Sequence, residues 1–534
     1  MKLRFSDIVE IVAEAGSASF DQPCAQWEDV SVSQAMTGRG VKVVLCAGET
    51  PVKYLRLRWK FAAEEKRSES VRVFGDAWER GYGDLEWRGV VPDRNMPWVC
   101  AVSNGSDSDP DVSGRFTECF GVAVRPNAFC MWQYDSHGLT LNIDVRNGGS
   151  GVLLGGRKLE VCEILFGEYR GVSAFAALKE YYKTLCTDPI FPKHPVYGSN
   201  NWYYAYGDSS HEEILSDTDF VVARCGQQQN IPYMVIDDGW QPNECDGPWH
   251  CGNEKFPDMK ALADAMKAKG VRPGIWVRYL HDEVRYLNDP KGEQSGISGE
   301  MRMMRDPFYL DPTHPDVQAL IVRDTKRIVE EWGYQLIKHD FSTFDFFGEW
   351  GSTVKGFLNT KDGWHFYDRS KTSAEIVIDF YRLIKEAAGD CIILGCNVIG
   401  HLAAGLVEMN RTGDDTSGRE WDRTRKMGVN TLAFRMLHHK AFYDVDADCV
   451  GVMGIIPWKL NGEWLRALSV SGTPLFVSYN PKLPEDEKAF ADLSAAFDRS
   501  AAQTDELIPL DWMETTCPEK WLLNGQTVEF EWFI

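Results

Sequence analysis

Hydrophobic and polar positions follow different periods in the first and second parts of the chain. Up to about residue 190, short alternating or apolar runs are separated by Gly, Asn, Asp and Pro clusters, a pattern typical of antiparallel strands and turns. This spacing predicts an N-terminal β-sandwich. A 3.6-residue period over 174–186 predicts a linker helix, and the Pro-rich turn 191–195 ends it. The clearest predicted strands are 41–45, 54–59, 70–74 and 139–143.

From residue 191 the pattern alternates between short apolar runs and amphipathic segments. Eight predicted strands with interleaved helices over about 310 residues match a (β/α)8 TIM barrel in number and length. An open, doubly wound sheet is the alternative, weakened because no Gly-rich phosphate loop follows any of these strands. The predicted strands are 196–202, 233–238, 273–278, 335–341, 391–397, 407–411, 449–453 and 475–478, and the predicted helices are 211–229, 258–269, 317–332, 374–388, 420–439, 463–470 and 486–497.

Two long connections and a short terminal segment complete this layout. The connections 279–315 and 342–373 leave the C-terminal ends of the third and fourth strands, where loops of a barrel form the substrate pocket. The end of the chain has two or three strands, too few for a core, so we expect it to pack on another domain. The prediction is therefore a multidomain α/β plus all-β protein with a sandwich domain and linker helix over 1–190, a barrel over 191–503 and a short C-terminal β segment over 504–534.

The acidic composition narrows the possible partners. The 534 residues carry a formal net charge of −22, from 79 acidic and 57 basic side chains. Such a chain repels nucleic acid and anionic membranes, so a neutral partner such as a sugar or a peptide is expected, with a homo-oligomer left open. No run approaches the roughly 20 apolar residues of a membrane span.

Cysteine usage and the N-terminus indicate the compartment. The 14 cysteines are scattered singly, and the first ten residues lack the apolar core of a signal peptide. We therefore expect a cytoplasmic protein with mostly free thiols. Cys245 and Cys251 lie six apart, but without a second pair or a nearby His-x-x-His they are better interpreted as unrelated thiols than as a metal or disulfide pair.

The central strand 335–341 suggests chemistry. Apolar residues lead into Lys338 and then Asp340, as in a buried barrel strand that places a carboxylate at its C-terminal end. Asp340 is then a candidate catalytic nucleophile. The alternative is that Lys338 and Asp340 form an ion pair without chemistry, and this strand alone does not decide between the two.

Other predicted strands bring acidic residues to the same barrel rim. The second strand ends at Asp237 and Asp238, and the sixth runs into Asp414 and Asp415. With Asp340 they form a site of several carboxylates, where Lys338 and Arg411 can keep some ionised and Trp202 and Trp276 add aromatic faces. Carboxylates with tryptophans meet the needs of glycoside hydrolysis, in which one carboxylate attacks the anomeric carbon and a second carboxyl group protonates the leaving oxygen.

The same residues allow simpler interpretations. A divalent metal on Asp237, Asp238 and Asp340 would lack a histidine, because His339 should point away from the pocket as the strand neighbour of Asp340; no cofactor is predicted. The Asp-Asp-Gly sequence at 237–239 could be a plain turn, and the two tryptophans could be core residues. One of Asp414 and Asp415 could cap the following helix.

Five short motifs resemble one enzyme family in order and spacing. They are Asp-Asp-Gly-Trp-Gln at 237–241, Phe-Pro-Asp-Met-Lys at 256–260 with Gly-Ile-Trp at 274–276, Lys-x-Asp at 338–340, Cys396, and Arg-x-x-x-Asp at 411–415. Together they resemble the clan D α-galactosidases, and glycoside hydrolase family 36 most closely. The match covers the barrel well and the two flanking β regions more loosely.

The resemblance implies a retaining exo-α-glycosidase that acts by double displacement on terminal α-galactose. Its nucleophile corresponds to Asp340 and its acid/base to Asp415 rather than Asp414. The pair that binds the galactose O4 and O6 corresponds to Asp237 and Asp238. Further substrate contacts implied by the resemblance fall on Trp202, Trp276, Lys338, Cys396, Asn397 and Arg411.

The sequence departs from the family after the fifth strand. Family members commonly carry a Cys-Ser-Gly-Gly-like stretch where this chain has Cys396, Asn397 and then Gly400. In the related family 27 this region contacts the sugar 2-position, so the choice between galactose and N-acetylgalactosamine stays open. A raffinose-synthase-like transgalactosylase and a catalytically inactive sugar-binding barrel also stay open as functions of such a chain.

Overall fold

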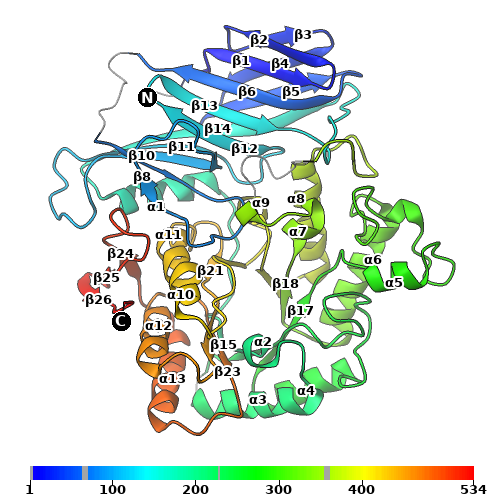
Figure 1. Ribbon diagram of the computed structural model, residues 1–534, viewed down its shortest axis with the longest axis vertical. Coiled ribbons are helices and arrows are strands. Elements are labelled where there is room, and N and C mark those ends of the chain that lie inside the picture. Colours follow the sequence, from blue (N-terminus) through cyan, green and yellow to red (C-terminus); the bar gives the residue numbers. More distant parts are fainter. Residues whose placement is uncertain (1–3, 63–69, 227–228, 354–360, 534) are drawn as a thin grey trace.

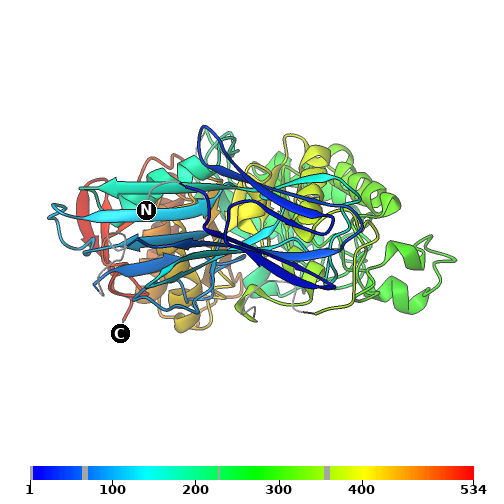
Figure 2. The same ribbon diagram turned by 90° about the horizontal axis from the view of Figure 1, so that it is seen from above.

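The computed structural model describes residues 4–62, 70–226, 229–353 and 361–533. Within them it has a mixed α/β architecture with several sheets. The N-terminal strands form the top of the molecule in Figure 1 and extend across much of its width when seen from above in Figure 2. Their bounds are β1 (Ile8–Ala13), β2 (Gly16–Phe20), β3 (Ala25–Trp27), β4 (Val30–Met36), β5 (Val41–Ala47), β6 (Val52–Lys60), β7 (Arg72–Gly75), β8 (Trp87–Arg88), β9 (Met96–Pro97), β10 (Val99–Ser103), β11 (Phe116–Val122), β12 (Phe129–Asp135), β13 (Gly138–Asp144) and β14 (Lys158–Arg170).

These strands form two antiparallel sheets, ordered β2-β1-β6-β13-β12-β9 and β3-β4-β5-β14-β11-β10-β7-β8. Alternation of buried and half-buried side chains along β1 and β5 leaves one face of each for a core. The two sheets share that core: Trp59 of the first meets Phe166 of the second edge to face, with ring centroids 5.9 Å apart. The four strands predicted most clearly here are all present.

Helix α1 (Ala174–Leu185) follows, as the change of period predicts. Its first turn is capped by Ser173, whose hydroxyl accepts from the N–H of Ala176 at 3.1 Å. The remaining helices are α2 (Trp202–Ala205), α3 (His211–Arg224), α4 (Met259–Lys269), α5 (Glu283–Asn288), α6 (Pro315–Lys326), α7 (Ser342–Phe347), α8 (Ser373–Ala388), α9 (Gly400–Ala403), α10 (Trp421–Arg423), α11 (Thr431–Arg435), α12 (Trp458–Ser469) and α13 (Glu487–Ser500), with π-helical turns at Arg327–Glu331 and Thr424–Asn430 and 3-10 turns at Gly299–Met301 and Gly351–Thr353.

The second part is built on one curled sheet in which every pairing is parallel, in the order β21-β20-β19-β18-β17-β16-β15-β23-β22. All eight predicted strands are present. The sheet also contains β21, which the pattern missed because Asp-Val-Asp is not an apolar run. Only Ala447 and Asp448 separate β21 from β22 in the chain. The strands are β15 (Tyr197–Asn200), β16 (Tyr233–Ile236), β17 (Arg272–Val277), β18 (Leu336–His339), β19 (Ile392–Gly395), β20 (Met409–Arg411), β21 (Asp444–Asp446), β22 (Cys449–Val452) and β23 (Leu475–Tyr479).

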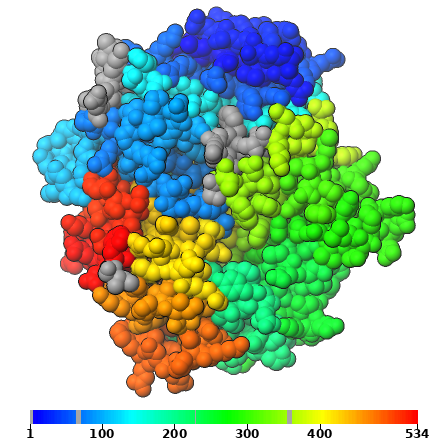
Figure 3. Space-filling view, viewed as in Figure 1, coloured from blue at the N-terminus to red at the C-terminus, as the bar shows by residue number. Residues whose placement is uncertain are grey.

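The C-terminal segment is a small antiparallel sheet of β24 (Leu507–Pro509), β25 (Lys520–Leu523) and β26 (Gln526–Glu529). Its buried Trp512 packs on Trp87 of the first part, with ring centroids 5.4 Å apart, and on Phe434 of α11, at 5.2 Å. Figure 3 shows this segment in red between the first part and the orange helices α12 and α13. The expectation that it packs on other parts of the chain is confirmed.

All 14 cysteines are free, as predicted from their scattered positions. Within the described ranges, no helix is both long and apolar enough to cross a membrane.

Candidate active site

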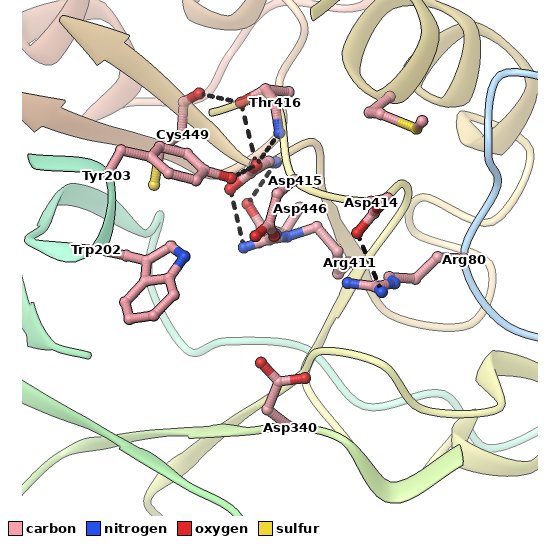
Figure 4. A network of polar contacts seen from close by, with 12 residues as sticks. Arg80, Trp202, Tyr203, Asp340, Arg411, Asp414, Asp415, Thr416, Asp446 and Cys449 are labelled. Atoms are coloured by element: carbon pink, nitrogen blue, oxygen red, sulfur yellow. Dashed lines mark hydrogen bonds and ion pairs between the residues drawn. The ribbon is translucent and has the colours of Figure 1, made fainter. Parts of the chain in front are cut away.

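A cavity of about 120 Å³ lies at the C-terminal ends of the parallel strands. Eight of the ten site residues predicted from the sequence line it, contributed by the ends of β16 to β20 and by α2. Figure 4 shows Asp340 facing Asp414 and Asp415 across an open space, with Trp202 to one side and Arg80 to the other. The lining residues are Arg80, Trp202, Asp237, Asp238, Cys245, Trp276, Lys338, Asp340, Phe341, Trp350, Asn397, Asp414 and Asp415.

Asp340 follows β18 directly and is held by two donors. The indole N–H of Trp276 donates to its Oδ2 at 3.1 Å, and the backbone N–H of Phe341 donates to its Oδ1 at 2.7 Å. Burial alone would raise the pKa of Asp340, but the charges of Lys338 and Arg80, together with these hydrogen bonds, lower it. Asp340 is therefore an anionic carboxylate, only 7% exposed, that lines the cavity.

Lys338 does not form the ion pair with Asp340 that the strand alone left open. Its Nζ donates to Oδ2 of Asp237 at 2.6 Å, and Asp237 raises the pKa of Lys338 against the effect of burial. The same carboxylate oxygen accepts from Asn200 at 2.6 Å. His339, between Lys338 and Asp340, packs on Phe380 away from the cavity, and burial lowers its pKa to about 4. The alternation of a strand thus places Lys338 and Asp340 on one face, as predicted.

The Asp238 carboxylate accepts hydrogen bonds from three donors, which a plain turn residue would not need. Its Oδ1 accepts from Gln241, and Oδ1 also accepts from the backbone N–H of Cys245 at 3.0 Å. The Cys245 thiol donates to Oδ2 at 2.7 Å, and burial raises the pKa of that thiol. Asp237 and Asp238 are both buried and both face the cavity.

Asp415 lies in a different electrostatic environment from Asp340. Burial and the neighbouring charge of Asp448 raise its pKa, against the opposing charge of Arg411. Arg411 reaches Oδ1 of Asp415 only at 3.5 Å, because its closer partners are Asp446 at 2.9 Å and Asp448 at 3.0 Å. Asp415 is therefore the carboxyl group of this cavity that is suited to carrying a proton.

Asp414 has the opposite surroundings. Arg80 pairs with its Oδ1 at 3.1 Å and Arg423 with its Oδ2 at 2.9 Å, so two guanidinium groups neutralise it. Neither aspartate caps the next helix, since the residue before α10 is Glu420. The cap interpretation was wrong because a turn at 417–419 separates the pair from the helix.

Two predicted substrate contacts do not line the cavity. Arg411 lies behind Asp415 in the cluster with Asp446 and Asp448. The Cys396 side chain is 1% exposed, and burial raises its pKa. Both residues border the site without facing the space in it.

The cavity also contains residues that were not predicted as site residues, although Trp350 lies in the long connection 342–373 that we expected to form the pocket. Cys245, Phe341 and Trp350 come from loops after β16 and β18, and Phe341 has a left-handed backbone, with φ of 62°. Arg80 comes from the N-terminal part, between β7 and β8. Its only sequence signal is a charged pair, Glu79-Arg80, between aromatic residues.

Asn397 is held by this N-terminal segment. Oriented to satisfy both partners, its amide N–H donates to Oε2 of Glu79 at 3.0 Å, and its oxygen accepts from Nη2 of Arg80 at 3.0 Å. Among the residues that the structure describes, no group of three or more His, Cys, Asp or Glu side chains is arranged to hold a metal ion.

No protein-family model and no curated protein sequence matches the chain. Several solved structures do match the chain. An α-galactosidase from Thermus thermophilus, TtGalA, in complex with p-nitrophenyl α-D-galactopyranoside, is 16% identical over 93% of this chain and 99% of that one, with a TM-score of 0.57. The GH36 α-galactosidase AgaA from Geobacillus stearothermophilus is 14% identical over 96% of this chain and 79% of that one, with a TM-score of 0.61. The galactosidase domain of the α-galactosidase–sucrose kinase AgaSK is 15% identical over 96% and 77%, with a TM-score of 0.61.

The chain has the fold of GH36 α-galactosidases. The resemblance to family 36 noted in the sequence is thereby confirmed for the architecture, from the N-terminal sheets to the parallel sheet that carries the cavity.

Proposed function

We propose that the protein is a retaining exo-α-galactosidase, with Asp340 as nucleophile and Asp415 as acid/base. One observation carries the proposal: two carboxyl groups line one cavity in opposite environments, which lower the pKa of Asp340 and raise that of Asp415. Double displacement needs one charged and one protonated carboxyl group at the same time. The fold, shared with solved α-galactosidases, supports the choice of substrate.

In the first step, the Asp340 carboxylate attacks the anomeric carbon and forms the glycosyl–enzyme ester. The bond to the aglycone breaks, and Asp415 gives its proton to the departing oxygen. The N–H groups of Trp276 and Phe341 fix the direction of attack. In the second step, Asp415 takes a proton from water, the hydroxide attacks the anomeric carbon, and Asp340 leaves as a carboxylate.

Asp237 and Asp238 bind O4 and O6 of the sugar in this proposal, and Trp202 and Trp276 take its apolar faces. Lys338, already bonded to Asp237, lies between that pair and Asp340. The cavity volume of about 120 Å³ favours one sugar ring over a longer chain, which supports an exo mode of action.

The proposed architecture is an N-terminal β-sandwich, a closed (β/α)8 barrel and a C-terminal β segment, with boundaries near 190 and 503. Facing aromatic side chains between the two N-terminal sheets support the sandwich. The two ends of the parallel sheet order, β21 and β22, are consecutive in the chain, which supports a closed barrel whose seventh strand is broken at Asp448. Cytoplasmic location and oligomeric assembly stay predictions.

The test is turnover of aryl glycosides by the wild type and single variants. We expect hydrolysis of the α-galactoside above the α-N-acetylgalactosaminide, α-glucoside and β-arabinopyranoside. Asp340→Ala and Asp415→Ala should each lose about 10³-fold or more in kcat, and azide should restore Asp340→Ala by forming a β-galactosyl azide. Asp414→Ala is the matched control, a neighbouring carboxylate whose loss should cost far less and show no rescue.

Wild-type turnover in either catalytic variant would refute the assignment. Binding of galactose without turnover of any substrate in the panel would instead favour the inactive sugar-binding barrel. More oligosaccharide than free galactose from galactinol and sucrose would favour the transgalactosylase.

A further inference from the structure

Arg80 is a cationic side chain that the N-terminal part contributes to a cavity otherwise built by the parallel sheet. The N–H of Gly81 donates to the carbonyl of Thr412 at 2.8 Å, and the N–H of Asp414 donates to the carbonyl of Gly81 at 3.2 Å. This short parallel bridge fixes the backbone next to Arg80 against the loop that carries the acid/base. The position of the Arg80 backbone is therefore fixed by hydrogen bonds between the N-terminal part and the loop after β20.

The Arg80 guanidinium is held by polar partners and also lies 5.8 Å from the ring centres of both Tyr82 and Trp350. Asp414 and Asn397 both accept from Nη2, at 3.1 and 3.0 Å. An arginine has five N–H donors, and these contacts use only those on Nη2. Nε is buried without a hydrogen-bond partner among the described residues, while the side chain as a whole lines the cavity. Donor capacity thus remains at the edge of the sugar site.

The position of Arg80 along the rim indicates which hydroxyl group it meets; this step rests on the proposed function. The proposed O4 and O6 contacts lie at the end of β16, and the nucleophile lies at the end of β18. Arg80 meets Asn397 after β19 and Asp414 after β20, on the far side of the nucleophile. Arg80 and Asp340 line the same cavity, and the charge of Arg80 lowers the pKa of Asp340, so we place Arg80 on the side of the sugar that carries the anomeric carbon.

With O4 and O6 at Asp237 and Asp238 and the leaving oxygen at Asp415, only O2 and O3 remain for Arg80. O3 adjoins O4 and so faces Lys338, which is bonded to Asp237. O2 is attached to the carbon next to the anomeric centre. We infer that Arg80 binds the 2-hydroxyl group of the sugar and thereby selects galactose over its 2-acetamido form.

The same contacts explain the selection. Asp414 and Asn397 hold the guanidinium in place, and Glu79, which anchors Asn397, accepts in turn from the backbone N–H of Gly351 at 2.9 Å. A bulky 2-acetamido group would have to displace this fixed side chain. A sugar without a 2-hydroxyl group would leave the buried guanidinium without an acceptor. An unpaired buried donor costs free energy, so the enzyme should act much less efficiently on such a sugar.

The experiment compares kcat/KM for three aryl α-glycosides: galactoside, 2-deoxygalactoside and 2-acetamido-2-deoxygalactoside. The galactoside-to-2-deoxy ratio is measured in the wild type, Arg80→Met and Arg80→Lys. We expect Arg80→Met to reduce the ratio by about 10- to 100-fold, the effect of one charge-assisted hydrogen bond, and to raise the relative rate on the 2-acetamido substrate. Each variant is compared on the same substrates, so their intrinsic reactivities cancel in the comparison.

Arg423→Met is the matched control. It removes the other guanidinium of Asp414; Arg423 also donates to the backbone carbonyl of Asp415 at 2.7 Å, but its own side chain does not line the cavity. Its ratio should stay within about twofold of the wild type even if its overall rate falls. Arg80 also joins two parts of the chain, so Arg80→Lys covers the case in which Arg80→Met fails to fold. The lysine keeps a positive charge beside Asp414 but lacks the planar set of guanidinium donors. A reduced ratio in that variant supports the inference.

A ratio within about twofold of the wild type in a folded Arg80 variant overturns the inference while leaving the α-galactosidase proposal intact. A wild type that is inactive on the parent galactoside overturns the proposed function, and the inference with it. The two failures are therefore distinguished by the first substrate measured.

Discussion

Asp448 offers a direct test of how the acid/base obtains its proton. It lies between β21 and β22, where its Oδ1 pairs with Nη2 of Arg411 at 3.0 Å. Its Oδ2 accepts from the N–H and hydroxyl groups of Thr416, at 2.8 and 3.0 Å, and from the Tyr203 hydroxyl. Arg411 and these donors lower the pKa of Asp448 against the effect of burial, so it is a fixed negative charge beside Asp415.

Asp448→Asn keeps the shape and removes that charge. Both carboxylates contact one guanidinium, which places them roughly 6 Å apart, and at an effective dielectric constant of about 20 two unit charges at that distance interact by about 2.8 kcal/mol. This corresponds to about 2 pH units. The Asp415 side chain is 36% exposed, and solvent screening reduces the expected shift to about one unit.

The sign follows from the proposed role. Asp415 works as an acid only while protonated, so activity falls as the pH rises through its pKa. Without the charge of Asp448, and with Arg411 less neutralised, the pKa of Asp415 falls. The basic limb of the kcat/KM profile for an aryl α-galactoside should therefore move to lower pH by about one unit, with the acid limb, which reports Asp340, unchanged.

Asp446→Asn is the control, since Asp446 pairs with Nε of the same guanidinium at 2.9 Å but, unlike Asp448, is not among the main charges that raise the pKa of Asp415. It should shift the basic limb by much less. A basic limb that stays in place or moves upward in Asp448→Asn, measured on protein with wild-type secondary structure, would refute the reasoning.

Two further predictions concern stability. Asp76→Asn removes the charge from a buried group that pairs with Arg435 at 3.1 Å and His438 at 2.8 Å, and should cost about 3 kcal/mol in urea unfolding at pH 7. Because those partners lower the pKa of Asp76 in the folded state, the difference from wild type should persist above an unfolded pKa of about 4 and shrink below it; a constant difference down to pH 3 would contradict this. Trp532→Ala empties a fully buried site under the C-terminal sheet and should cost about 3–5 kcal/mol, whereas Phe533→Ala, at a side chain that is 53% exposed, should cost under about 0.5; equal effects would contradict the packing role of Trp532.

The hydrophobic pattern predicted most of the strands because the burial of each strand determines which of its own residues are apolar. The parallel strands are buried on both faces and appear as continuous apolar runs, so all eight predicted strands are present. β21 was missed for the corresponding reason: it is three residues long and two of them are aspartates, which pair with Lys440 and Arg411 after folding. A strand held by ion pairs rather than by apolar side chains leaves no apolar signal.

The carboxylates of the site were predictable for a topological reason. Parallel strands end at one rim, so acids that follow separate strands converge, and Asp237, Asp238, Asp340 and Asp415 do line one cavity. Partners were not predictable in the same way. Lys338 lies two residues from Asp340 in the chain, yet it pairs with Asp237 at the end of β16, two strands away in the sheet, because distances in the folded structure decide ion pairs and sequence spacing does not.

Asp414 and Asp415 show where sequence reasoning ends. They are adjacent, chemically identical and both in the cavity, and nothing in their residue types separates them. Their difference comes from distant segments: Arg80 and Arg423 neutralise Asp414, whereas Asp448 acts on Asp415. The N-terminal part, which no motif connects to catalysis, therefore contributes to the different surroundings of the two aspartates. Arg80, which we infer to bind the sugar 2-hydroxyl group, forms an ion pair with Asp414, whereas the main charge that raises the pKa of Asp415 is that of Asp448.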